Sequence, residues 1–122
     1  MNDLIIQPTG KTPEIILTPG NISFSGRSII DNILEFFEPV KQWMHEYVEH
    51  PADSTEVTVK YEYLDSRSTQ VLYQLLAEIQ SITKKGYTVH IKWHYEYGDV
   101  EMVKLGEIIQ NRLETEFEFI EI

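Results

Sequence analysis

The sequence predicts an α/β protein with a mixed, mostly parallel sheet that carries its helices on one face. The first reason is length, because 122 residues suit one compact domain. The second is the order of the predicted elements, β-β-α-β-α-β-α-β, in which right-handed crossovers between parallel strands keep the helices on one side. The third is that residues 56–63 and 87–97 alternate apolar and polar side chains. A strand buried on both faces would be continuously apolar, so one face of this sheet should meet solvent.

The first predicted elements are two short strands. Residues 1–13 hold two prolines and a glycine, and we expect them to form a loose leader before a single domain over residues 14–122. Residues 14–17 and 21–25 have the composition of strands. The intervening Thr18-Pro19-Gly20 is typical of a turn, which predicts a hairpin.

A helix is predicted between Asp31 and Glu49. Apolar residues recur there at intervals of three or four, as in an amphipathic helix. Pro39 lies inside the segment and cannot donate a helical hydrogen bond, so we expect a kink or a division near residues 35–38. The apolar residues are Ile30, Ile33, Leu34, Phe37, Val40, Met44, Tyr47 and Val48.

The two alternating segments are the strands on which the fold prediction mainly depends. Each has one apolar and one polar face, since successive strand residues point to opposite sides. The expected buried residues are Val57, Val59, Tyr61 and Tyr63 in the first strand, and Val89, Ile91, Trp93 and Tyr95 in the second. The expected exposed residues are Glu56, Thr58, Lys60 and Glu62, and then His90, Lys92, His94 and Glu96.

Two further helices and a last strand complete the chain. Residues 68–84 place an apolar stripe on one helical face, and Gly86 follows as a natural C-cap. Lys84 and Lys85 suit the negative end of that helix. Residues 100–113 predict a third helix and residues 116–122 a final strand. The central stripe consists of Leu72, Leu75, Leu76, Ile79 and Ile82, and the third helix uses Met102, Leu105, Ile109 and Leu113.

Composition and charge exclude several kinds of function. The net charge is −10 and the ten basic residues are scattered, so nucleic acid and anionic membranes are not expected partners. The chain has no cysteine, which removes disulfides and thiol chemistry. The start of the chain lacks the pattern of a signal peptide, and no apolar run approaches the roughly 20 residues of a membrane span. We therefore expect a cytoplasmic protein.

The stretch Tyr63-Leu64-Asp65-Ser66-Arg67-Ser68-Thr69 lies where the central strand ends and the next helix begins. Helix capping by itself accounts for Asp, Ser and Thr at such a position. A helix start with exposed hydroxyls is also favourable for a phosphate, because free N–H groups and the helix dipole stabilise an added anion. Spacing alone leaves both interpretations open.

Other candidate sites are weaker. His90, His94 and Glu96 share a strand face, but residues four apart on a strand are about 13 Å apart, too far for both histidines to bind one ion without a bend. The aromatic residues of the strands have the period of core packing. Phosphate-binding glycine loops and the H-E-x-x-H and G-x-S-x-G motifs are absent. We therefore expect a protein that is not an enzyme and needs no metal or cofactor.

Two motifs resemble those of a known family. Tyr63-Leu64-Asp65-Ser66-Arg67-Ser68, followed by an apolar helix and then Trp93-His94-Tyr95-Glu96, resembles the SiaC family of bacterial regulatory phosphoproteins. These are single STAS-like domains with a Y-L-N/D-[ST]-x-S stretch before the central helix and a W-H-Y-[DE] stretch ending the next strand. The resemblance covers nearly the whole chain, including Thr12-Pro13-Glu14-Ile15, residues 22–26 and Gln42-Trp43.

This resemblance implies a partner switch controlled by phosphorylation. A serine/threonine kinase would modify Ser66, a PP2C-like phosphatase would remove the phosphate, and the unmodified protein would bind a diguanylate cyclase or a similar signalling enzyme. The family's acceptor is a threonine, and Arg67 stands where a small residue is familiar. The Asp65-Ser66 pair also resembles anti-sigma-factor antagonists, which is the alternative function. Those proteins usually continue with small residues and glycines, and they lack the W-H-Y motif.

A partner is expected to dock around Ser66. The predicted docking residues are Asp65, Arg67 and Ser68 at the helix start, with Arg27 and Ser28 in the neighbouring loop of residues 26–31. A phosphate would add roughly two negative charges to a surface that is already acidic, and would oppose docking. Arg67 is a candidate to pair with that phosphate and so to soften the switch. A constitutive scaffold would instead bind its partner whatever the state of Ser66.

Overall fold

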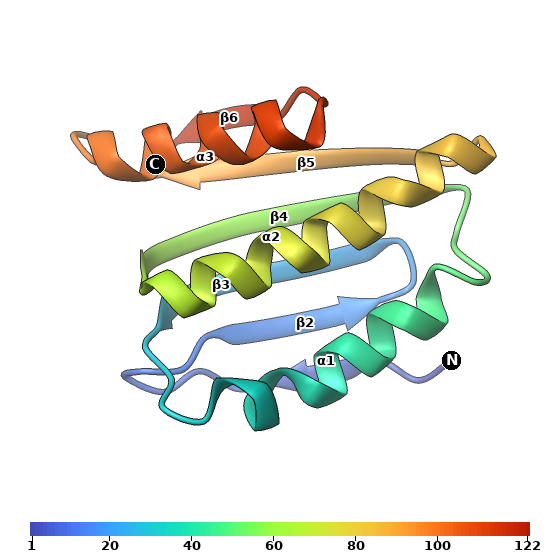
Figure 1. The fold of residues 1–122 in the computed structure, drawn as a ribbon, viewed down its shortest axis with the longest axis horizontal. Coiled ribbons are helices and arrows are strands. Elements are labelled where there is room, and N and C mark those ends of the chain that lie inside the picture. The colour runs from blue at the N-terminus through green and yellow to red at the C-terminus, as the bar shows by residue number, and fades with distance from the viewer.

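The computed structural model describes residues 1–122, which form one six-stranded sheet with three α-helices (Figure 1). A short 3₁₀ helix, η1, follows the second α-helix directly. None of the helices combines the length and the hydrophobicity that a membrane-spanning helix needs. The elements are β1 (Leu4–Ile6), β2 (Glu14–Thr18), β3 (Asn21–Ser28), α1 (Ile33–Tyr47), β4 (Ser54–Leu64), α2 (Ser66–Gln80), η1 (Ser81–Lys85), β5 (Thr88–Tyr95), α3 (Val100–Leu113) and β6 (Glu118–Glu121).

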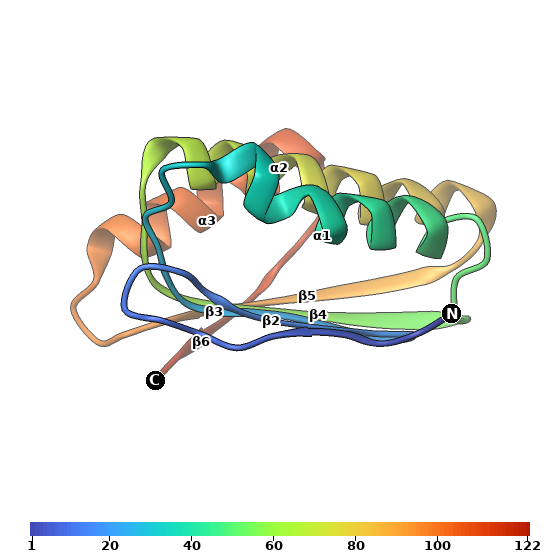
Figure 2. The ribbon, with the colours of Figure 1, turned by 90° about the horizontal axis from the view of Figure 1, so that it is seen from below.

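The strands lie in the sheet in chain order, from β1 to β6. The pairs β1–β2 and β2–β3 are antiparallel, and β3–β4, β4–β5 and β5–β6 are parallel. Each parallel crossover therefore proceeds in the same direction across the sheet, and right-handed crossovers then place all helices on one side. Figure 2 shows this arrangement, with the three helices above the sheet and its other face bare. The predicted fold class is confirmed.

The alternation of side chains explains why only one face is covered. Val57, Val59, Ile91 and Trp93 are buried beneath the helices, while the polar residues between them lie on the bare face. There Lys92 Nζ lies 2.5 Å from Glu56 Oε1. The hydrogen bond and the charge of Lys92 lower the pKa of the Glu56 carboxyl, and the same pair raises the pKa of Lys92.

The expected loose leader contains a strand, so the prediction for residues 1–13 is wrong at its start. Residues 4–6 form β1 and pair with residues 15–17 of β2. The indole Nε1 of Trp43 in α1 donates a hydrogen bond to the carbonyl of Asn2, at 2.9 Å. A three-residue strand is too short to give a periodic signal, and its partners here are supplied by the tertiary structure.

Pro39 does not divide the first helix, contrary to one form of the prediction. The helix α1 runs without a break from Ile33 to Tyr47, with Pro39 inside it. Proline removes one intrahelical hydrogen bond, but the buried face of α1, which includes Phe37, Val40 and Met44, packs on the core on both sides of that position. Burial of this apolar face offsets the lost bond.

The central helix ends near the predicted C-cap, Gly86, but it begins earlier than predicted. The helix α2 begins at Ser66, two residues before the predicted start, and is followed by η1. Gly86 then has a φ of 95° in the left-handed region, as expected for a C-cap. The start at Ser66 places the predicted acceptor in the first helical position.

Candidate functional site

The structure places Ser66 at a strand-to-helix junction with its side chain exposed. β4 ends at Leu64, Asp65 is the N-cap, and Ser66 is the first residue of α2. β3 and β4 are parallel, so the segment that follows β3 lies at the same end of the sheet. In Figure 1 this end is on the left, where α2 and α3 also begin. The junction therefore gathers several segments that are distant in the sequence.

Asp65 makes the cap of α2. Its carboxylate accepts a hydrogen bond from the backbone N–H of Ser68 at 2.8 Å. Its carbonyl accepts from both the N–H and the hydroxyl of Thr69, each at 2.9 Å. The cap is thus supplied by the residues on either side of Ser66, and none of these bonds uses the Ser66 hydroxyl. The cap therefore does not depend on that hydroxyl.

Ser28 and Ser68, which were predicted to contact a partner, are buried in this structure, so neither side chain lies on the surface. Their exposed fractions are 0% and 1%. The Ser28 hydroxyl donates to Ser68 Oγ at 2.7 Å, and the Ser68 hydroxyl donates to the Ser28 carbonyl at 3.1 Å. The same carbonyl accepts from the N–H of Asp65 at 3.1 Å. These bonds fasten the end of β3 to the start of α2, and they hold the junction in place beneath Ser66.

Arg67 reaches away from its own helix to the segment before α1. One guanidinium nitrogen, Nη2, donates to the carbonyls of Ile30 at 2.6 Å and Asp31 at 2.8 Å. Arg27 lies at the same end of the sheet, with its guanidinium carbon 5.5 Å from the centre of the Tyr63 ring. Both predicted arginines are therefore at the junction, and each is held by a different neighbour.

Four large apolar side chains are exposed on segments that begin or end at this end of the sheet, and their exposure was not predicted. Leu34 is 70% exposed, although it was assigned to the apolar stripe of its helix. Tyr63 is 47% exposed although it was expected in the core, because the register between β3 and β4 shifts after Gly26. Tyr97 and Val100, after β5, are 84% and 58% exposed. For Tyr97 and Val100 the available signal was an apolar side chain soon after a parallel strand, whereas Leu34 and Tyr63 lie inside α1 and β4 and gave no such signal.

The histidines on the bare sheet face do not form a metal site. His90 Nε2 lies 2.9 Å from Glu118 Oε1, and no group of three or more His, Asp or Glu side chains is arranged to hold an ion. His90 instead belongs to a row of polar side-chain contacts across β4, β5 and β6, which also includes Glu56, Lys92 and Glu118.

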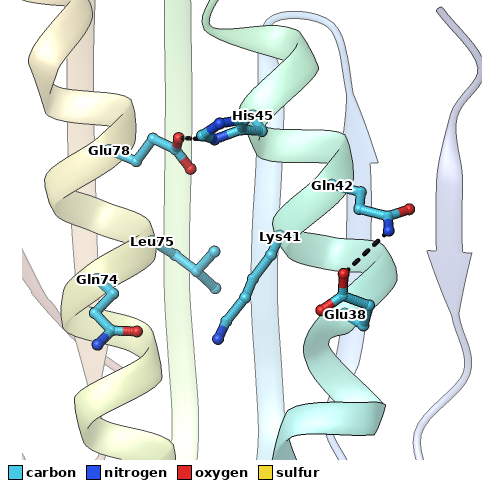
Figure 3. Close-up of a pocket in the computed structure, with 7 residues that line it drawn as sticks. All are labelled: Glu38, Lys41, Gln42, His45, Gln74, Leu75 and Glu78. Carbon is cyan, nitrogen blue, oxygen red and sulfur yellow. Dashed lines mark hydrogen bonds and ion pairs between the residues drawn. The ribbon is translucent and has the colours of Figure 1, made fainter.

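A hollow of about 450 Å³ lies between α1 and α2 (Figure 3). Its walls are polar except for Leu75, and it is crossed by a contact of 2.6 Å between His45 Nδ1 and Glu78 Oε2. Gln74 is its nearest lining residue to Ser66 along α2, about 12 Å away by the helical rise. This hollow is separate from the junction.

One mixed sheet with all its helices on one face makes this chain an α/β domain of STAS-like fold. The model of the SiaC family of regulatory phosphoproteins matches residues 6–122. The chain therefore belongs to the SiaC family.

Known proteins support this assignment. An uncharacterized protein of Pseudomonas aeruginosa strain UCBPP-PA14 is 27% identical over 109 residues, which cover 88% of this chain and 86% of the relative. The structure of SiaC of Pseudomonas aeruginosa matches with a TM-score of 0.83 and 27% identity, over 98% of this chain and 97% of that one. A crystal structure of the diguanylate cyclase SiaD in complex with its activator SiaC, from the same organism, matches with a TM-score of 0.82. Identity there is 24% over 98% of each chain, which shows the fold alone.

Proposed function

We propose that this protein binds and controls a signalling enzyme, a diguanylate cyclase, and that phosphorylation of Ser66 ends the interaction. The observation that carries the proposal is the exposed Ser66 hydroxyl in the first turn of α2, beside a cap made by Asp65. Membership of a family of regulatory phosphoproteins supports it. The solved complex of a diguanylate cyclase with an activator of the same fold supports the choice of partner. The protein itself acts without catalysis, in the cytoplasm.

The modification is an ordinary phosphoryl transfer. A serine/threonine kinase moves the γ-phosphoryl group of ATP to Ser66 Oγ, so that an O–P bond forms, ADP leaves and the hydroxyl proton is lost. A PP2C-like phosphatase returns the hydroxyl by hydrolysis, with water supplying the oxygen of the released phosphate. The phosphate adds about −1.5 to −2 charges at pH 7.

The docking surface consists of Leu34, Tyr63, Ser66, Tyr97 and Val100, with Arg27 and Asp65 at its polar positions. Apolar and aromatic side chains give an interface most of its binding energy when they are desolvated in the complex. A phosphate at Ser66 would have to lose water in the same interface, on a chain whose net charge is already −10. A penalty of about 1–3 kcal/mol would weaken binding roughly 5- to 150-fold, which is enough for a switch.

The test measures binding of a purified diguanylate cyclase to four forms of the protein: unmodified, Ser66→Ala, Ser66→Asp, and Ser54→Asp as a matched control. Ser54 is an exposed serine at the opposite end of β4, about 33 Å from Leu64 along the strand. We expect Ser66→Asp alone to lose affinity by fivefold or more, and the partner's activity to fall with it.

Equal binding by Ser66→Ala and Ser66→Asp would refute the switch and favour a constitutive scaffold. An anti-sigma factor bound in place of the cyclase, and released by Ser66→Asp, would establish the alternative function as an anti-sigma-factor antagonist.

A further inference from the structure

Arg67 joins the modified turn to a segment that precedes another helix. Its Nη2 donates to the carbonyls of Ile30 and Asp31, at 2.6 and 2.8 Å, across 37 and 36 positions of the sequence. Both carbonyls belong to residues 29–32, which connect β3 to α1. Arg67, in the same helical turn as Ser66, thus binds the segment that leads into α1.

Few other hydrogen bonds hold this connecting segment. The N–H of Ile29 donates to the carbonyl of Lys11 at 2.8 Å, and the Ile30 side chain is buried. Asn32, the N-cap of α1, makes no capping bond with its side chain, which donates instead to Glu35 at 3.2 Å. Arg67 is therefore the side chain that supplies hydrogen bonds from α2 to the segment.

A phosphate on Ser66 would compete for that arginine. In the structure the positive guanidinium is bound by uncharged carbonyls. A phosphate would add the attraction of opposite charges and a geometry that often binds arginine through two bonds. The Asp65 carboxylate beside Ser66 is already bonded to the Ser68 N–H. Its negative charge increases the demand of the phosphate for a cation.

We propose that Arg67 is the positioning residue through which phosphorylation of Ser66 releases residues 29–33. The proposal rests on the proposed function for the modification itself and adds its structural consequence. When the guanidinium turns to the phosphate, the Ile30 and Asp31 carbonyls lose their donor and the start of α1 loosens. Leu34, in the first turn of α1, belongs to the docking surface, so the modification alters the shape of that surface as well as its charge.

Hydrogen exchange of the full chain tests the release directly. Phosphoserine is incorporated at position 66 during synthesis of the protein, so that no kinase is needed, and amide exchange is followed over residues 29–36. We expect phosphorylation to speed exchange there by about tenfold, as for local opening of a weakly held segment.

The matched control is Arg27→Ala, which removes an arginine at the same end of the sheet that contacts Tyr63 and not the segment. Arg27→Ala should keep the full response. Arg67→Ala should exchange rapidly in both states, with no further change on phosphorylation.

A second readout reports on the phosphate itself. Phosphorus NMR follows the second ionisation of phosphoserine, whose pKa is ordinarily about 6. A paired guanidinium favours the dianion, so this pKa should be lower in the phosphorylated protein than in its Arg67→Ala variant. Arg67→Lys, which keeps the charge, should restore most of the difference. A purely structural role for Arg67 would not move this ionisation.

Two results would overturn the proposal: unchanged exchange on phosphorylation of the otherwise unaltered chain, or an equal increase in the Arg67→Ala variant. Neither measurement uses a kinase or a cyclase. If Ser66→Asp fails to release the cyclase while exchange still responds, the proposed function is wrong and the role of Arg67 stands. If Ser66→Asp releases the cyclase while phosphorylation leaves exchange unchanged, the proposed function stands and the role of Arg67 is wrong.

Discussion

The buried pair of Ser28 and Ser68 allows a sharp test of which junction residues are structural. Replacing Ser68 with alanine removes the acceptor of the Ser28 hydroxyl and one donor to the Ser28 carbonyl. The carbonyl keeps its bond from the N–H of Asp65. The Ser28 hydroxyl is left without a hydrogen-bond acceptor, and it is fully buried. The perturbation therefore leaves one buried donor unsatisfied.

The magnitudes follow from which bonds survive. An unsatisfied buried polar group costs about 1–3 kcal/mol, so we expect Ser68→Ala to lower the free energy of unfolding by that amount. Ser28→Ala should cost less, about 0.5–1.5 kcal/mol, because the Ser68 hydroxyl can still donate to the backbone carbonyl. In the double variant no unpaired hydroxyl remains, so its loss should be smaller than the sum of the single losses.

Urea denaturation of the four proteins measures these differences as a double-mutant cycle. Ser66→Ala is the matched control, since it removes an exposed hydroxyl from the same turn and should change the free energy of unfolding by less than about 0.5 kcal/mol. Additive losses, or an unchanged stability in Ser68→Ala, would refute the structural role. Reduced partner binding in Ser68→Ala with unchanged stability would instead support direct partner contact.

Three further predictions concern packing, ionisation and capping. In Gly106→Ala the new methyl would lie 2.7 Å from the indole Nε1 of Trp93, so thermal or urea unfolding should show that the free energy of unfolding falls by about 1–3 kcal/mol. Gly10→Ala is the control, because a methyl there meets nothing within 4 Å and should leave stability unchanged. Burial raises the pKa of the Tyr61 hydroxyl, so the unfolded chain ionises first and stability should fall as pH rises above about 10. Urea titrations should show a shallower fall in Tyr61→Phe, and an identical slope would contradict the argument. Asp65→Ala should cost about 1 kcal/mol of stability while Asp65→Asn costs little; equal losses in the two variants would mean that the cap is not what Asp65 contributes.

Local signals account for the parts of the fold and site that were predicted. The alternation in residues 56–63 and 87–97 placed one sheet face in solvent, and the bare face of the structure agrees (Figure 2). The Asp65 cap and Gly86 C-cap bounded the central helix to within a few residues. Hydrophobic periodicity and helix capping depend only on residues that are close together in the sequence. The exposed position of Ser66 at the start of α2 follows from these local signals.

The errors arose where a contact joins distant segments. Ser28 and Ser68 are 40 residues apart and Arg67 is 37 from Ile30, and no spacing rule specifies such pairs. The strand in the leader likewise depends on β2 and on Trp43. Phosphorylation of Ser66, its effect on a partner and the role of Arg67 stay predictions for the experiments above.

The sequence by itself determined the succession of strands and helices after β1, the solvated face of the sheet and the place of Ser66 at a helix start. These follow from periodicity and capping, which each segment carries in its own residues. The tertiary structure decided which hydroxyls of the junction are buried, which carbonyls Arg67 holds and which apolar side chains stay exposed around Ser66. Those outcomes depend on how segments pack across the fold, because burial and long-range hydrogen bonds exist only after the segments have been brought together.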